Sequence, residues 1–160
     1  MATTCTSGRR TIRLHVPTGK FISPVGVTAL IKCRYHQAHV PIEEQETIEG
    51  HSVRAMYLLT AAADLVREDP SSNYEKLTKA IDRLWANMVD CKMYSTGGIG
   101  AMSQWEGFGI DYFLPQGTDE GGCYAETCAS IGIMMFADRL LKVGSSLPNQ
   151  ACSADVFTTA

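Results

Sequence analysis

The chain has 160 residues, 45% of them hydrophobic and 19% charged, which suits one domain with its own core. Its net charge of −3 gives no electrostatic reason to expect a nucleic-acid partner. No apolar run approaches the roughly 20 residues that a membrane span requires, so we expect no membrane partner either. The six cysteines are irregularly spaced and no apolar signal segment precedes them, so we expect a reduced, cytoplasmic chain.

The first 34 residues are the least informative part of the chain. Residues 1–42 hold six basic and no acidic side chains, which indicates a boundary near residue 35. Residues 11–16, TIRLHV, alternate apolar and polar side chains as a short β-strand does, and Pro17 ends the pattern. We therefore treat residues 1–34 as an unassigned N-terminal segment that is irregular or β.

Helices are predicted over most of the remaining chain. Ser72 and Glu75 have the spacing of a capping box at one helix start, and Gly144 is a suitable stop for the last helix. A short loop joins the first two helices and predicts a helical hairpin, while residues 143–160 read as a loose tail. Apolar side chains at three- and four-residue steps predict the helices Glu43–Arg67, 73–91 and Cys128–Lys142.

Residues 94–130, between the last two predicted helices, collect glycines, aromatic side chains, glutamates and cysteines. The run STGGIG, residues 95–100, lacks the lysine and the preceding strand of a phosphate loop, so we expect its glycines to adopt positive φ or to let the backbone approach a ligand closely. Glu106 lies between Trp105 and Phe108, and such apolar neighbours raise the pKa of a carboxyl group. A glutamate held near neutrality suits general acid catalysis, although a solvated loop glutamate fits the same residues.

Glu126 and Cys128 are candidate metal ligands. Residues i and i+2 point to the same side of an extended chain but to opposite sides of a helix. If both bind one ion, they must precede or straddle the helix start, with Thr127 as a candidate N-cap and the helix N-terminus favouring a Cys128 thiolate. A carboxylate and a thiolate suit zinc, which takes four ligands, and Cys123 is a candidate third. The alternative is a buried cysteine beside a solvent-facing glutamate.

Three histidines stand out in the middle of the sequence. His36 and His39 have the spacing of a metal-binding pair, but without a third ligand nearby in the sequence we interpret both as polar loop residues. His51 follows Gly50 and shares its predicted helix face with Arg54. From these residues alone, His51 is a hydrogen-bonded core histidine.

Four stretches of the chain, in this order, carry a resemblance to a known family: YHQAHVPIEEQETIEGHSVRAMYLLTAAADL, RLWANMVDCKMYSTGGIG, WEGFGIDYFLP and YAETCASIGIMMFADRLL. They make residues 35–142 resemble the catalytic domain of glycoside hydrolase family 127, the β-L-arabinofuranosidase family. The resemblance implies an all-α chain whose helical hairpins form part of an (α/α)6 barrel. It also implies a carbohydrate substrate and the retaining hydrolysis of glycosidic bonds.

The resemblance also assigns roles to single residues. Glu106 in WEGF matches the general acid/base, Glu126 and Cys128 in ETC match two zinc ligands, and His51 in GHSVRA matches a histidine of the sugar pocket. The family's nucleophile is a zinc-bound cysteine from a Cys-Cys motif downstream of ETC. The 160 residues contain no adjacent pair of cysteines, so the resemblance implies a partial site.

Two interpretations from different classes follow. In the first, the chain is part of a glycosidase with zinc as its cofactor, and the nucleophile comes from outside the chain. In the second, it is a non-catalytic, truncated helical fragment or an interaction module. A partial barrel leaves apolar helix faces uncovered, and such faces favour self-association.

Overall fold

The computed structural model describes residues 32–69, 73–117 and 123–144. These ranges contain three α-helices of 17 residues each and a short helical stretch at residues 32–35, and their β-structure is limited to isolated bridges. The predicted all-α class is thereby confirmed. The elements in chain order are the 3₁₀ helix η1 (Ile42–Glu44) and the α-helices α2 (Ser52–Glu68), α3 (Glu75–Cys91) and α4 (Thr127–Val143).

Some predicted features lie outside the described residues. They are the strand at residues 11–16, the Ser72 cap and the tail from residue 145 onwards. None of the helices in the described part of the chain is long and apolar enough to cross a membrane.

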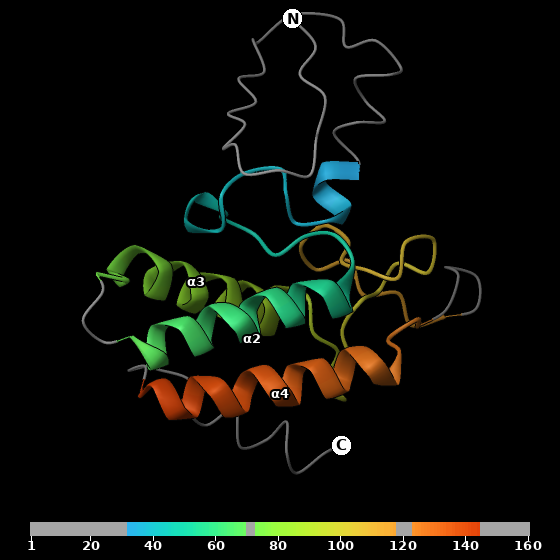
Figure 1. Cartoon of the computed structure of the whole chain (residues 1–160). Helices are drawn as coiled ribbons and strands as arrows, with labels where there is room; N and C mark the ends of the chain where they lie inside the picture. Colours follow the sequence, from blue (N-terminus) through green and yellow to red (C-terminus); the bar gives the residue numbers. More distant parts are fainter. Residues whose placement is uncertain (1–31, 70–72, 118–122, 145–160) are drawn as a thin grey trace, which may run out of the picture.

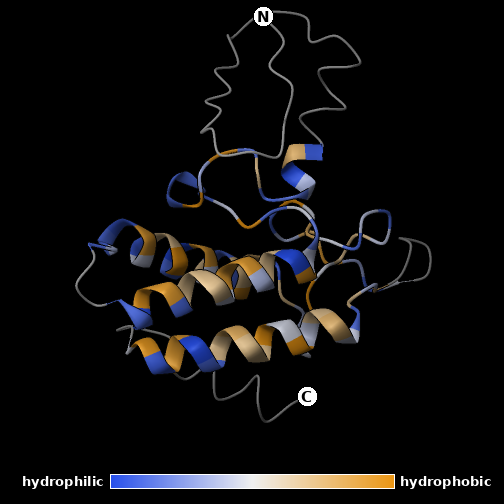
Figure 2. Ribbon diagram, viewed as in Figure 1, coloured by the Kyte–Doolittle hydropathy of each residue, from blue (hydrophilic) through white to orange (hydrophobic). Residues whose placement is uncertain are grey.

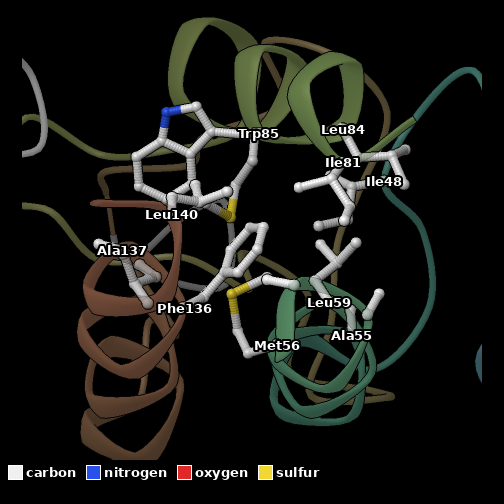
Figure 3. Close-up of a cluster of buried hydrophobic side chains, with 14 of the residues drawn as sticks. Ile48, Ala55, Met56, Leu59, Ile81, Leu84, Trp85, Phe136, Ala137 and Leu140 are labelled. Atoms are coloured by element: carbon white, nitrogen blue, oxygen red, sulfur yellow. The ribbon is translucent and has the colours of Figure 1, made fainter. Parts of the chain in front are cut away.

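The three long helices pack around one set of buried side chains, with α3 on one side and the pair α2 and α4 on the other (Figures 1 and 3). α2 and α3 make the predicted hairpin, and α4 packs along α2. α2 and α4 begin at the same end of this bundle, which is also where α3 ends (Figure 1). The described loop residues between α3 and α4, yellow to orange in Figure 1, lie at this end. The chain therefore gathers its most irregular segments around two helix N-termini.

The helices share one hydrophobic core. Each helix carries hydrophobic and hydrophilic residues (Figure 2), and the apolar side chains meet between the helices (Figure 3). Trp85 of α3 and Phe136 of α4 pack edge to face, with ring centroids 5.5 Å apart. A Cβ atom at Gly132 of α4 would lie 2.8 Å from the Cβ of Met56 on α2. Glycine at this position therefore lets the two helices approach closely.

The start of α2 differs from the prediction. The helix was expected from Glu43, but η1 covers only Ile42–Glu44, and α2 begins at Ser52. Ile48 is buried as expected. Its backbone N–H donates to Asn87 Oδ1 of α3 at 3.0 Å, and its carbonyl accepts a hydrogen bond from Lys92 Nζ, just after α3, at 2.9 Å. These tertiary hydrogen bonds hold the segment in a non-helical conformation.

The ends of α4 follow the prediction to within one residue. Glu126 is the N-cap in an extended conformation (φ −73°, ψ 152°), so Thr127, expected as the cap, is instead the first helical residue. Gly144 ends the helix in the left-handed region with φ 67°, as predicted. The extended backbone at Glu126 is the conformation that the spacing argument required of a Glu126–Cys128 pair.

Candidate active site

The structure brings His51 and Glu106 together. His51 is the N-cap residue of α2, and its Nε2 lies 3.2 Å from Glu106 Oε2. The His51 side chain is 12% exposed and the Glu106 side chain is 51% exposed. The apolar enclosure expected for Glu106 is therefore not observed, because half of its side chain faces solvent. A buried imidazole thus holds a carboxylate that solvent or a ligand can reach.

Backbone hydrogen bonds fix the position of Glu106. Glu106 has a φ of 52°, in the left-handed region that non-glycine residues adopt at a cost. Its carbonyl accepts hydrogen bonds from Ser52 N at 3.0 Å and from Ser52 Oγ at 2.8 Å. Two residues further along the same loop, Phe108 N donates to Gly50 O at 2.9 Å, which ties the loop to the residue before His51. The start of α2 therefore holds the loop that carries Glu106.

The position of His51 is fixed from the opposite side. Its N–H donates to Tyr35 O at 3.2 Å, and the Tyr35 ring packs edge-on against the imidazole, with centroids 5.5 Å apart. Gln37 Nε2 donates to the carbonyls of Tyr35, Glu49 and His51. Nδ1 of His51 is buried and has no hydrogen-bond partner among the described residues. The Nε2 N–H of His51 is therefore the ring donor that faces the Glu106 carboxylate.

Glu126 and Cys128 lie side by side at the start of α4. The hydrogen bond between them raises the pKa of the Cys128 thiol above its usual value. The expectation that the helix N-terminus favours a Cys128 thiolate is therefore wrong for the chain as it stands. The Glu126 carboxylate accepts a hydrogen bond from the thiol, and this effect outweighs the backbone N–H groups of Cys128 and Ala129, which lower the pKa.

Tyr124 is a site residue that sequence reasoning missed. Its hydroxyl donates to Glu126 Oε2 at 3.2 Å. Burial, the hydrogen bond to Glu126 and the negative charge of Glu106 together raise the pKa of Tyr124 to about 12. One phenol therefore lies between the two carboxylates. Its position in YAETC, two residues before Glu126, was the signal available in the sequence.

The glycines of residues 95–100 join the two halves of the site. Gly97 and Gly100 have φ values of 82° and 81°, as predicted for this run. A Cβ atom at Gly100 would lie 2.8 Å from Ser52 Oγ, and one at Gly98 would lie 2.9 Å from the Cβ of Ala125. The close approach that we expected toward a ligand is thus made toward α2 and toward the segment that precedes α4.

The donor set for zinc is incomplete in the described residues. They contain no group of three or more His, Cys, Asp or Glu side chains that could hold a metal ion. Cys123 lies beside Tyr94 instead, and burial together with the hydrogen bond to Cys123 raises the pKa of Tyr94 to about 12. Glu126 and Cys128 supply two donors of the types that zinc takes, and a four-coordinate site requires two more.

A pocket of about 910 Å³ adjoins this site. Gly50 and Trp105, the chain neighbours of His51 and Glu106, belong to its walls. The other lining residues come from four stretches of the chain: Arg34, Tyr35, Thr47, Glu49, Lys92, Met102, Phe108, Gly109, Ile110, Asp111 and Phe113.

Comparisons with known proteins identify the family. The model of the β-L-arabinofuranosidase GH127 catalytic domain matches residues 12–156. A non-reducing end β-L-arabinofuranosidase from Bifidobacterium longum subsp. longum is 40% identical over 110 residues, which cover 69% of this chain and 16% of that protein.

Solved structures agree with the sequence matches. A GH127 β-L-arabinofuranosidase from Geobacillus stearothermophilus T6 superposes with a TM-score of 0.65 and 41% identity, over 77% of this chain and 18% of that one. A second GH127 β-arabinofuranosidase superposes with a TM-score of 0.64 and 37% identity, over 81% and 20% of the two chains. The chain thus spans 16–20% of the length of these relatives. From its sequence and its all-helical fold, the chain belongs to the GH127 β-L-arabinofuranosidase catalytic-domain family, as part of a much larger family domain.

Proposed function

We propose that residues 35–142 carry the acid/base half of a retaining glycosidase site that acts on β-L-arabinofuranosides. The observation that carries the proposal is the convergence of His51, Glu106, Glu126 and Cys128 at one end of the fold, in two contacting pairs. These are the residues that the family motifs assigned to the site. The substrate class follows from the printed activities of the relatives, which are β-L-arabinofuranosidases.

Each described residue has a defined task in this proposal. Glu106 protonates the leaving oxygen in the first step and then accepts a proton from the attacking water in the second. Its 51% exposed side chain is accessible to the substrate. His51 orients that carboxyl group through the 3.2 Å contact to Nε2. Tyr124 keeps Glu126 in position through its hydroxyl hydrogen bond.

Glu126 and Cys128 would hold zinc together with two cysteines from outside this chain. When bound, zinc keeps a cysteine ligand deprotonated and therefore nucleophilic. Cys128 must then release its proton, and the raised pKa of its thiol opposes this step until a metal competes with the proton. We therefore expect weak zinc binding by the chain alone.

A second candidate function rests on a different observation. Large apolar side chains on the helices are exposed, with Tyr57, Leu65 and Leu141 at 58%, 55% and 54%. Together with the lack of an adjacent cysteine pair in the sequence, this surface fits a non-catalytic helical fragment or an interaction module.

Metal and ligand binding separate the two functions. The first function predicts that zinc, measured by equilibrium dialysis, binds the wild-type chain and Cys123→Ser but not Cys128→Ser. It also predicts that methyl β-L-arabinofuranoside shifts the NMR signals of the His51 ring, and that Glu106→Gln keeps this binding. Loss of zinc in Cys123→Ser would contradict the ligand assignment. Absence of both zinc binding and sugar binding would leave the non-catalytic function.

A further inference from the structure

A lysine at the end of α3 lies between the two segments that carry the His51–Glu106 pair. Lys92 is the C-cap residue of α3, and its backbone N–H donates to Met88 O at 3.0 Å. Its side chain is only 5% exposed, although a lysine is rarely buried unless its charge is paired. The partners of this buried ammonium group explain its position.

The ammonium group binds both segments at once. Nζ donates to Ile48 O at 2.9 Å and to Gly109 O at 3.0 Å. Ile48 lies three residues before His51, and Gly109 lies three residues after Glu106. The Asp111 carboxylate, 3.3 Å from Nζ, balances the positive charge. One side chain from the end of α3 therefore joins the segment that precedes His51 to the loop that follows Glu106.

Asn87 connects the same two segments less strongly. Its Oδ1 accepts from Ile48 N at 3.0 Å, and its Nδ2 donates to Asp111 Oδ1 at 3.2 Å. The contact of Asn87 with Asp111 is exposed, whereas that of Lys92 with Ile48 is buried. Hydrogen bonds from a charged donor in a buried setting contribute more than neutral bonds near solvent. Lys92 is therefore the stronger of the two connections.

Lys92 also belongs to the wall of the 910 Å³ pocket. A pocket lysine can bind a ligand directly, through any of its three ammonium protons. In this chain two protons are donated to backbone carbonyls, and a carboxylate neutralises the charge. The ammonium group is thus already paired with protein atoms, which favours a positioning role over ligand binding.

We propose that Lys92 is a positioning residue that holds Glu106 against His51 by joining their two backbone segments. The proposal rests on the proposed function, which takes Glu106 as the acid/base and His51 as the residue that orients it. Glu106 has a φ of 52°, and its loop needs outside contacts to keep this costly conformation. Ser52 binds the carbonyl of Glu106, and Lys92 binds the same loop three residues later. Attachment at two points fixes the carboxylate more precisely than one.

A pair of substitutions tests the proposal by NMR of the full chain. In the wild-type background, Glu106→Gln replaces a charged acceptor 3.2 Å from His51 Nε2 with a neutral amide, so the Nε2 signal should shift. We expect this response to be lost in Lys92→Met, which keeps the apolar stem of the side chain and removes the ammonium group. A residue that only stabilised the fold would leave the response intact in every folded variant.

Two further variants serve as controls. Lys79→Met removes another lysine of α3, which is 68% exposed and pairs with Glu75 on the same helix. Gly132→Ala disturbs the packing of α4 against α2, away from the loop that carries Glu106. We expect both variants to keep the full response of His51 to Glu106→Gln.

The outcomes separate positioning from general stability. An unchanged response in Lys92→Met would overturn the proposal, and so would an equal loss in Gly132→Ala. If Lys92→Met does not fold, Lys92→Gln replaces it, because the glutamine side chain is one bond shorter and cannot span both carbonyls. A retained response in that variant overturns the proposal in the same way.

Failure of the proposed function gives a different result. A wild-type chain that binds neither zinc nor methyl β-L-arabinofuranoside would overturn the glycosidase function. If the response of His51 still depends on Lys92 in that chain, the positioning role stands without it. No response of His51 to Glu106→Gln in the wild-type background would overturn the contact between the two residues and this proposal with it.

Discussion

Gly107→Ala tests whether backbone pairing at this one residue holds the candidate site together. A Cβ atom at Gly107 would collide with Gly50 O and would lie 2.8 Å from the carbonyl carbon of Gly50. Cδ1 of the Trp105 side chain, at 2.7 Å, could move aside, but the two Gly50 atoms belong to the backbone, so no side-chain rotation can relieve the contacts with them. The loop that carries Glu106 must therefore move away from the segment that carries His51.

Two estimates of the cost agree. Overpacking by one methyl group typically costs about 1–3 kcal/mol. If the loop that carries Glu106 instead separates from the start of α2, the protein loses the two hydrogen bonds from Ser52 to Glu106 O and the one from Phe108 N to Gly50 O. At about 1 kcal/mol each, these losses sum to roughly 3 kcal/mol. We therefore expect Gly107→Ala to lower the free energy of unfolding by about 2–3 kcal/mol.

Urea unfolding followed by circular dichroism at the helix band measures this change, by linear extrapolation to water. Gly117→Ala is the matched control, because nothing lies within 4 Å of its Cβ position. Where a glycine adopts backbone angles open to alanine, the substitution stabilises by about 0.4–1 kcal/mol through the unfolded chain. The reasoning is refuted if Gly107→Ala unfolds at the wild-type urea concentration, or if both variants lose the same stability.

Three further predictions concern the helices and the metal side of the site. Ser52→Ala removes the 2.8 Å side-chain donor to Glu106 O and keeps the backbone donor, so urea unfolding should show a loss of about 1 kcal/mol. Gly132→Ala places a Cβ atom 2.8 Å from an α2 side chain and should cost about 1–3 kcal/mol in the same assay, and an unchanged midpoint would contradict the packing argument. Glu126→Gln removes the carboxylate that stabilises the protonated Cys128 thiol, so the pKa of Cys128 should fall. More thiolate is then present at pH 7–8, and peptide mass spectrometry should show faster alkylation of Cys128 with unchanged rates at the other cysteines. Equal Cys128 rates in wild type and variant would refute the assignment.

The family comparison changes how the exposed surface of the chain is interpreted. The chain matches 16–20% of the length of its relatives, and several large side chains on α2 and α4 are exposed. Exposed apolar side chains on packed helices are the surface that further helices of a larger domain would cover. For this reason, stability measurements on the chain need a control for self-association, such as sedimentation at several concentrations.

Local patterns determined the helices of this protein. A three- and four-residue spacing of apolar side chains reflects the geometry of a single helix, so α3 and α4 agree with the predictions to within about two residues. The stop at Gly144 and the positive φ of Gly97 were also readable, because each depends on one residue's own backbone. The motifs WEGF, ETC and GHSVRA identified four residues that the structure then placed at one end of the fold.

Tertiary structure decided how these residues meet. Ile48 fits a helical spacing, yet Asn87 and Lys92 form hydrogen bonds with its backbone, and the helix begins only at Ser52. The pKa of Cys128 is raised and not lowered, because the Glu126 carboxylate accepts a hydrogen bond from the thiol. Sequence spacing does not predict the orientation of that carboxylate. The placement of Tyr124 near Glu106 and the contact of His51 with Glu106 depend on segments distant in the chain. A sequence pattern records the geometry of one element, whereas the donors, acceptors and charges that set the chemistry of this site come from different elements brought together by packing.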